Sequence, residues 1–304
     1  MSRTARVAVA AGNTLGEGLV WCPRKQCLYW TDIQAATLWC HWPDTGITRT
    51  WAMPERLACL ALCEDSDWLL LGLAGGLAFL HLPDGAIMPI RTVEDDLPTR
   101  LNDGACDREG RFVFGTLHEP TDGGAQQPLA SFYRLDADLT LHRLALDKVA
   151  ISNSIAFSPD GRTMYFCDSS TRIIQRCAYD REGNAGPAEA WVDLRDITGE
   201  PDGSTVDSDG GLWNAQWAMG RVVRYAADGR EDGIIEVAAP RPTRPVLGGP
   251  GLNTLFVTSA HDGMSAAERL AWPQSGHVFA AHSTHKGHAD TPFAGHLPGT
   301  DAVC

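Results

Sequence analysis

The sequence lacks the features that mark nucleic-acid-binding and membrane-spanning proteins. Its 304 residues contain 25 Lys and Arg against 38 Asp and Glu, a formal net charge of −13, and the basic residues form no cluster. Such an acidic chain repels phosphate backbones, so we expect no nucleic-acid partner. The uncharged apolar stretch of residues 68–83 is shorter than the ~20 apolar residues of a spanning helix, so we expect no membrane partner.

An export signal and a disulfide framework are also missing. Residues 6–11 form only a short apolar run, whereas a secretory signal needs about seven apolar residues or more. The nine cysteines are odd in number, and none lies at the paired spacing of a zinc knuckle. We therefore expect a cytoplasmic protein whose cysteines are reduced and behave as small buried hydrophobes.

Helical periodicity is scarce, and residues 266–272 are the best helix candidate. A different pattern dominates: an apolar strand, a turn of Asp, Gly or Pro, and a second strand with aromatic residues. It occurs six times, in residues 20–33, 61–73, 105–117, 156–168, 205–217 and 246–260. The repeat is roughly 45 residues long, which is the length of a propeller blade of three or four strands.

These repeats predict an all-β fold, a six-bladed β-propeller. Residues 6–11 form a strand without a hairpin partner, so we expect them to close the ring by joining the blade formed by residues 246–282. We expect residues 1–304 to form one propeller domain and a monomer. Residues 285–304 contain three histidines but are rich in Gly and Pro, so we expect a solvated C-terminal extension.

Polar residues interrupt the apolar pattern four to six residues before the aligned position of four repeats. They are Glu17, Asn102, Asn153 and Asp202. Equivalent positions of different blades converge on the propeller axis, so these side chains would meet there. Each motif alone also suits an ordinary turn, and it is the recurrence that favours a site. Oxygen ligands suit a hard divalent cation such as calcium, magnesium or manganese, which can polarise a carbonyl during ester or lactone hydrolysis.

The same residues carry a resemblance to a known family over residues 13–282. The motifs are LGEGLVW (15–21), LYWTDI (28–33), RLNDGACDREGRFVFGTL (100–117), ISNSIAFSPDGRTMYFCDSSTRII (151–174), PDGSTVDSDGGLWNAQWAMGRVVRY (201–225) and GGPGLNTLFVTSA (248–260). In this order they resemble the SMP-30/gluconolactonase, or regucalcin-like, family. Those proteins are six-bladed propellers that hydrolyse sugar lactones.

The resemblance implies a role for each matching residue. Glu17, Asn153 and Asp202 match the metal ligands, and Asp202 also matches the general base that activates water. Arg100 and Asn102 match residues that contact the sugar, and Glu119 falls near a residue of the family's lid.

Two further positions bear on the size of the pocket. Ser154 replaces a glycine of the family motif, and we expect its side chain to narrow the pocket floor. Trp217 could line the pocket, although an aromatic residue in a strand is more often core packing.

These observations predict a metal-dependent lactonase that opens a sugar lactone to the aldonic acid. We favour a pentonolactone such as arabinono- or xylonolactone, with gluconolactone next. The cofactor would be one divalent metal ion, with Ca, Mg, Mn, Zn and Fe(II) all open. The main alternative is a calcium-binding regulatory propeller without significant catalysis. A peptide-binding scaffold and a phosphotriesterase-like side activity are further alternatives.

Overall fold

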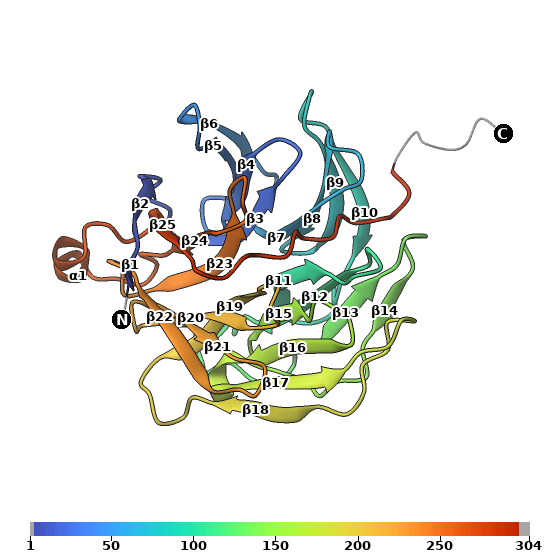
Figure 1. Cartoon of the computed structure of the whole chain (residues 1–304). Coiled ribbons are helices and arrows are strands. Elements are labelled where there is room, and N and C mark those ends of the chain that lie inside the picture. The colour runs from blue at the N-terminus through green and yellow to red at the C-terminus, as the bar shows by residue number, and fades with distance from the viewer. Residues whose placement is uncertain (1–2, 298–304) are drawn as a thin grey trace.

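Six antiparallel sheets are arranged as blades around a central axis in the computed structural model, which describes residues 3–297 (Figure 1). Blade 1 consists of β3 (Gly16–Cys22), β4 (Cys27–Asp32), β5 (Thr37–Trp42) and β6 (Ile47–Ala52). Blade 2 consists of β7 (Leu57–Leu62), β8 (Trp68–Leu73), β9 (Gly76–His81) and β10 (Ile87–Thr92). Blade 3 consists of β11 (Thr99–Cys106), β12 (Phe112–His118), β13 (Phe132–Leu135) and β14 (Leu141–Arg143).

The second half of the chain repeats this plan. Blade 4 consists of β15 (Ser152–Phe157), β16 (Thr163–Asp168), β17 (Ile173–Ala178) and β18 (Glu189–Asp193), with a short 3-10 helix η1 (Ser169–Thr171) after β16. Blade 5 consists of β19 (Glu200–Val206), β20 (Leu212–Trp217), β21 (Arg221–Tyr225) and β22 (Glu231–Glu236). Blade 6 contains β23 (Pro242–Gly248), β24 (Thr254–Ser259) and β25 (Val278–His282). The predicted six-bladed propeller is confirmed.

The N-terminal segment closes the ring. Strand β2 (Arg6–Val9) pairs antiparallel with β25, so that Arg6 lies opposite Ala280. The predicted joining of residues 6–11 to the last blade is therefore confirmed for β2. Strand β1 (Arg3–Thr4) was not predicted, and it extends blade 5 by pairing parallel with β22. The N-terminus thus links blade 5 to blade 6.

Every innermost strand carries an irregularity in its pairing with the second strand of its blade. The shifts in register lie between Glu17 and Val20, Leu57 and Cys59, Leu101 and Gly104, Asn153 and Ala156, Pro201 and Ser204, and Pro242 and Pro245. Such bulges bend a strand and change the direction in which its side chains point. The six innermost strands are thereby distorted at matching depths along the central channel.

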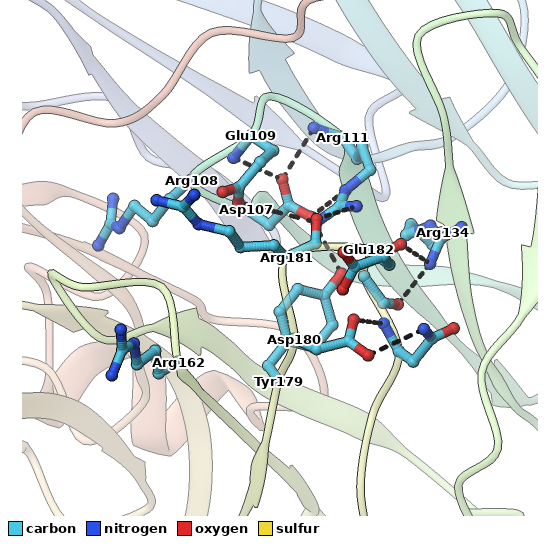
Figure 2. Close-up of polar contacts among 12 residues, drawn as sticks. Asp107, Arg108, Glu109, Arg111, Arg134, Arg162, Tyr179, Asp180, Arg181 and Glu182 are labelled. Atoms are coloured by element: carbon cyan, nitrogen blue, oxygen red, sulfur yellow. Dashed lines mark hydrogen bonds and ion pairs between the residues drawn. The ribbon is translucent and has the colours of Figure 1, made fainter.

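Neighbouring blades are joined by apolar clusters and by arginines that are buried or partly buried. Figure 2 shows two of these arginines at the boundary between blades 3 and 4. Arg134 donates to the carbonyl oxygens of Glu182 (2.9 Å) and Gly183, and its guanidinium also pairs with Asp136. Arg111 donates to the carbonyl oxygen of Arg181 (2.9 Å), so both arginines hold the hairpin that connects β17 to β18.

The expectation of a solvated C-terminal extension is wrong for residues 285–297. Figure 1 shows this segment in red, leaving β25 and running across the neighbouring blades. The Phe293 side chain is fully buried between blades 2 and 3, and its N–H donates to the carbonyl of Leu62 (2.7 Å). The abundance of Gly, Pro and His in this segment suggested a solvated tail and hid the importance of Phe293. Residues 298–304 lie outside the described residues.

Other expectations of local structure are confirmed. Helix α1 (Ala266–Ala271) falls within the predicted segment and begins with a capping box between Ser265 and Glu268. The eight cysteines of the described segment are all free thiols, and all but Cys106 are buried. Between residues 3 and 297, no helix is long and apolar enough to cross a membrane.

Candidate active site

A pocket of about 370 Å³ opens at one end of the central channel. The starts of four innermost strands, β3, β11, β15 and β19, supply most of its polar wall. The lining residues are Leu15, Glu17, Ile33, Arg100, Asn102, Leu117, Gln126, Ile151, Asn153, Ser169, Glu200, Pro201, Asp202, Trp217 and Asp262. Five of the six residues predicted for the site, all except Glu119, therefore lie in one pocket.

Glu17, Asn153 and Asp202 come together because each lies beside or within the bulge of its strand. Gly18 follows Glu17 with a φ of +58°, a conformation that glycine adopts without strain, and its N–H donates to the Glu17 carboxylate (3.0 Å). The Asn102 amide donates to the Asn153 side-chain oxygen (3.3 Å) and to the Ser152 carbonyl (2.8 Å). These contacts fix the amides of blades 3 and 4 beside the two carboxylates.

The electrostatics of this cluster are unfavourable for bare carboxylates. Burial, reinforced by the negative charge of Asp103, raises the pKa of Glu17 to about 7. Burial and the Glu17 charge raise the pKa of Asp202 well above its usual range. Two buried carboxylates that lie so close together need a proton or a cation between them.

The residues present fit a divalent metal ion. Two carboxylates and one amide oxygen form a set of hard oxygen donors, and two negative charges balance a divalent charge. Within residues 3–297 no group of three His, Cys, Asp or Glu could hold a metal. The cluster of Glu17, Asn153 and Asp202 contains only two such residues, because its third oxygen donor is the amide of Asn153.

A second layer of side chains lies nearer to the mouth of the pocket. Arg100 and Glu200 precede Asn102 and Asp202 by two residues on their strands, and all four residues line the pocket. Arg100 is buried, and its Nη1 donates to the Asn102 side-chain oxygen (3.1 Å). Its Nε donates to Glu119 (3.1 Å).

Glu119 does not line the pocket, contrary to the role expected for it. Both of its carboxylate oxygens accept from Arg56 (2.7 and 2.6 Å), and one also accepts from Arg100. Its hydrogen-bonding capacity is directed towards these two arginines. In this structure Glu119 therefore holds Arg100 in place. Arg56 was not predicted to act here, because it lies in another repeat and reaches Glu119 only through the packing of blades 2 and 3.

The prediction that Ser154 narrows the pocket is also wrong. Ser154 has a φ of +60°, is fully buried, and does not line the pocket. Its hydroxyl donates to the backbone carbonyl of Asp202 (2.6 Å). Ser154 thus supports the backbone of the neighbouring blade at Asp202. Trp217 had been expected either to line the pocket or to pack in the core, and it lines the pocket.

The sequence did not reveal a buried ion pair beneath the site. Asp103 lies in the bulge of β11 and accepts from the backbone N–H groups of Gly104 and Ile155 (both 2.8 Å). The guanidinium of Arg244 pairs with the same carboxylate. Arg244 lies two residues before the sixth repeat, and a charged residue next to this apolar segment was the available signal.

Comparisons with known proteins agree with this architecture. Residues 15–261 match the family model described as the SMP-30/Gluconolactonase/LRE-like region, and the chain belongs to this family. It is 52% identical to the L-arabinolactonase of Azospirillum brasilense over 93% of both chains. It is 36% identical to the pentonolactonase XacC of Haloferax volcanii over 81% of both chains.

The solved structures give the same fold. A protein of Agrobacterium tumefaciens, described as a calcium-binding protein, regucalcin, has a TM-score of 0.90 and 30% identity. The match covers 96% of this chain and 98% of that one.

Proposed function

We propose that the protein is a lactonase that hydrolyses a sugar lactone to the aldonic acid. The L-arabinolactonase and the pentonolactonase among its relatives support this activity. The observation that carries the proposal is the convergence of Glu17, Asn153 and Asp202 in the wall of a pocket that also contains Arg100 and Asn102. A pentonolactone such as arabinono- or xylonolactone is the favoured substrate, and gluconolactone is the next.

One divalent metal ion would be held by Glu17, Asn153 and Asp202. Ca, Mg, Mn, Zn and Fe(II) all accept oxygen ligands, and the donor set leaves the choice open. When bound, such an ion polarises the lactone carbonyl towards attack by water.

The protein's own groups perform the remaining steps. The Asp202 carboxylate accepts a proton from the water whose oxygen attacks the carbonyl carbon. The bond between that carbon and the ring oxygen then breaks, and the ring oxygen takes up a proton to become a hydroxyl. Arg100 donates hydrogen bonds to sugar oxygens, and Asn102 orients the ring against the pocket floor. The aldonic acid formed ionises at neutral pH and releases one proton to solution.

This released proton provides the test. Acid release from a panel of pentono- and hexonolactones is followed with a pH indicator, after EDTA treatment and after return of each divalent metal. We expect metal-dependent release on at least one pentonolactone, well above the spontaneous rate. Release at the spontaneous rate on every lactone and with every metal contradicts the proposal.

The same test addresses the alternative of a calcium-binding regulatory propeller. The match to a regucalcin described as calcium-binding supports that candidate. Calcium binding measured by calorimetry, combined with no turnover of any lactone, favours it over the lactonase.

A further inference from the structure

The carboxylate of Glu200 has no assigned role, although it lines the pocket. Glu200 is the first residue of β19 and lies two residues before Asp202, and both residues line the pocket. Two residues of a strand span roughly 6.6 Å, which places Glu200 one step nearer to the pocket mouth. Its side chain therefore faces the part of a bound sugar that is remote from the reacting carbonyl.

Glu200 is not engaged by the protein. No hydrogen bond or ion pair reaches its carboxylate from the rest of residues 3–297, although it is partly buried. Arg172 is the cation that acts on it electrostatically, but its guanidinium donates to the carbonyl oxygen of Ile197 (3.0 Å). A partly buried carboxylate without a partner is free to accept hydrogen bonds from a ligand.

The charge of the wall around Glu200 is negative. Beyond the metal-ligand candidates, the pocket contains two carboxylates, Glu200 and Asp262, and one cation, Arg100. The carboxylate of Glu119 is shared between Arg100 (3.1 Å) and Arg56 (2.6 Å), so it offsets the charge of Arg100 only in part. Among these lining residues the two carboxylates outnumber the one cation, so this part of the wall disfavours a negatively charged substituent on the substrate.

An aromatic side chain lies beside this carboxylate. Glu200 is paired with Trp217 across β19 and β20, and both residues line the pocket. An aromatic face covers the C–H surface of a sugar ring, while a carboxylate accepts hydrogen bonds from its hydroxyls. The combination suits a ligand that is rich in hydroxyl groups and uncharged.

We propose that Glu200 determines the specificity of this pocket for uncharged lactones. Its carboxylate accepts hydrogen bonds from the hydroxyls of the sugar and repels lactones that carry a carboxylate, sulfonate or phosphate group. The inference rests on the proposed lactonase function and adds the chemical class of its substrate. Hydrogen bonds to a charged acceptor are roughly twice as strong as neutral ones, so the Glu200 charge is expected to change affinity about tenfold.

Binding of unreactive analogues tests the inference without catalysis. A pentonolactam, in which N–H replaces the ring oxygen, is uncharged, and the monolactam of an aldaric acid carries one carboxylate. Calorimetry in the presence of Ca²⁺, and separately of Mn²⁺, compares the wild-type protein with Glu200→Gln. The matched control is Glu236→Gln, a partly buried carboxylate in β22 of the same blade, outside the pocket.

Glu200→Gln is expected to bind the uncharged lactam about tenfold more weakly and the carboxylated lactam about fivefold more tightly. Glu236→Gln is expected to behave as the wild type. An unchanged preference between the two lactams in Glu200→Gln overturns the inference. Failure of the wild-type protein to bind the uncharged lactam overturns it as well.

Turnover separates this inference from the proposed function. The kcat/KM values for a pentonolactone and for an aldaric acid monolactone are measured on the same three proteins. If the lactams respond to Glu200→Gln but no lactone is hydrolysed, the specificity stands and the lactonase fails. If lactones are hydrolysed but their ratio of kcat/KM values is the same in all three proteins, the lactonase stands and the specificity fails.

Discussion

Three carboxylates, Glu17, Asp103 and Asp202, share the central channel, and their surroundings divide their roles. Asp103 pairs with Arg244 and accepts two backbone hydrogen bonds (both 2.8 Å), which occupy its oxygens. Glu17 and Asp202 lack a cationic partner within the described chain, and they line the pocket. Asp103 therefore stabilises the channel, while the other two carboxylates are available for a cation, a water or a substrate.

Replacing Asp202 tests its role as base and ligand. Asp202→Asn retains the shape of the side chain but removes its charge and its ability to take up a proton at neutral pH. Since general bases contribute about 10²- to 10⁴-fold, we expect kcat to fall at least a hundredfold in the acid-release assay. The melting temperature should stay close to that of the wild type. The control is Asp44→Asn, an exposed turn residue, and turnover near the wild-type rate in Asp202→Asn would disprove the role.

The carboxylate pair also predicts how stability depends on pH when metal is removed. The pKa of Glu17 is about 7 in the folded protein, above its ordinary value of 4.5, so the folded state binds protons more tightly than the unfolded chain. Stability from this group is therefore present at low pH and is lost as the pH rises to about 7 and beyond. In EDTA, we expect the melting temperature to fall by about 2 °C more between pH 6 and pH 8 than in Glu17→Gln. Equal slopes for the two proteins would refute the prediction.

Among the secondary-structure elements, the sequence pattern was most informative where two strands meet at a turn. The turn at Asp207 was predicted from its Asp and Gly residues, and Asp207 does accept from the backbone N–H groups of Asp209 (3.0 Å) and Gly211 (2.8 Å). The ends of the inner strands were predicted only in part. Glu17, Asn153 and Asp202 were found because they recur at equivalent positions in the repeats. Arg56 and Glu200 were not predicted, because the packing of neighbouring blades brings Arg56 to Glu119 and the start of β19 brings Glu200 to the pocket wall.

At the scale of the secondary-structure elements, we predict that Arg134 stabilises the contact between blade 3 and the hairpin that joins β17 to β18. Arg134 is buried and joins it to blade 3 through two carbonyl oxygens, as Figure 2 shows. Arg134→Ala leaves these oxygens and Asp136 without their partner, at a cost of about 3 kcal/mol in the free energy of unfolding. We expect the melting temperature to drop by roughly 5 °C, while kcat at 25 °C stays unchanged.

The matched control for this change is Arg162→Ala in the neighbouring blade. Arg162 is exposed, and its side chain makes no hydrogen bond or ion pair with the residues that the structure describes. We expect this variant to melt within about 1 °C of the wild type, because isolated surface substitutions cost little. A similar loss of stability in both variants would show that Arg134 does not hold the two blades together.

At the scale of the whole molecule, a ring of blades needs contacts that join its two ends. Strands β1 and β2 provide them near the N-terminus, and β2 could be predicted because a propeller must close. The crossing by residues 285–297 could not be predicted, because its composition is that of a solvated tail. The backbone carbonyl of Lys286 accepts from the N–H of Ser208 in blade 5 (2.8 Å), and the N–H of Ala294 donates to the carbonyl of Gly110 in blade 3 (2.9 Å). His288 and Asp290 line a small cavity of about 20 Å³ next to Arg244. The segment thus spans the channel at the end opposite the pocket.

We expect residues 285–297 to stabilise the ring of blades mainly through the side chain of Phe293. Its ring packs against Phe79 with centroids 6.1 Å apart and is fully buried among residues of blades 2 and 3. Phe293→Ala removes a large buried side chain and leaves a cavity, a change that costs about 3 kcal/mol or more in the free energy of unfolding. Urea denaturation should therefore show a lower midpoint for Phe293→Ala, whereas Leu270→Ala on α1, where the leucine is 85% exposed, should leave it unchanged. Because the pocket lies at the other end of the channel, kcat/KM should be retained by Phe293→Ala in dilute buffer. A midpoint equal to that of the wild type would mean that the segment lies on the ring without stabilising it.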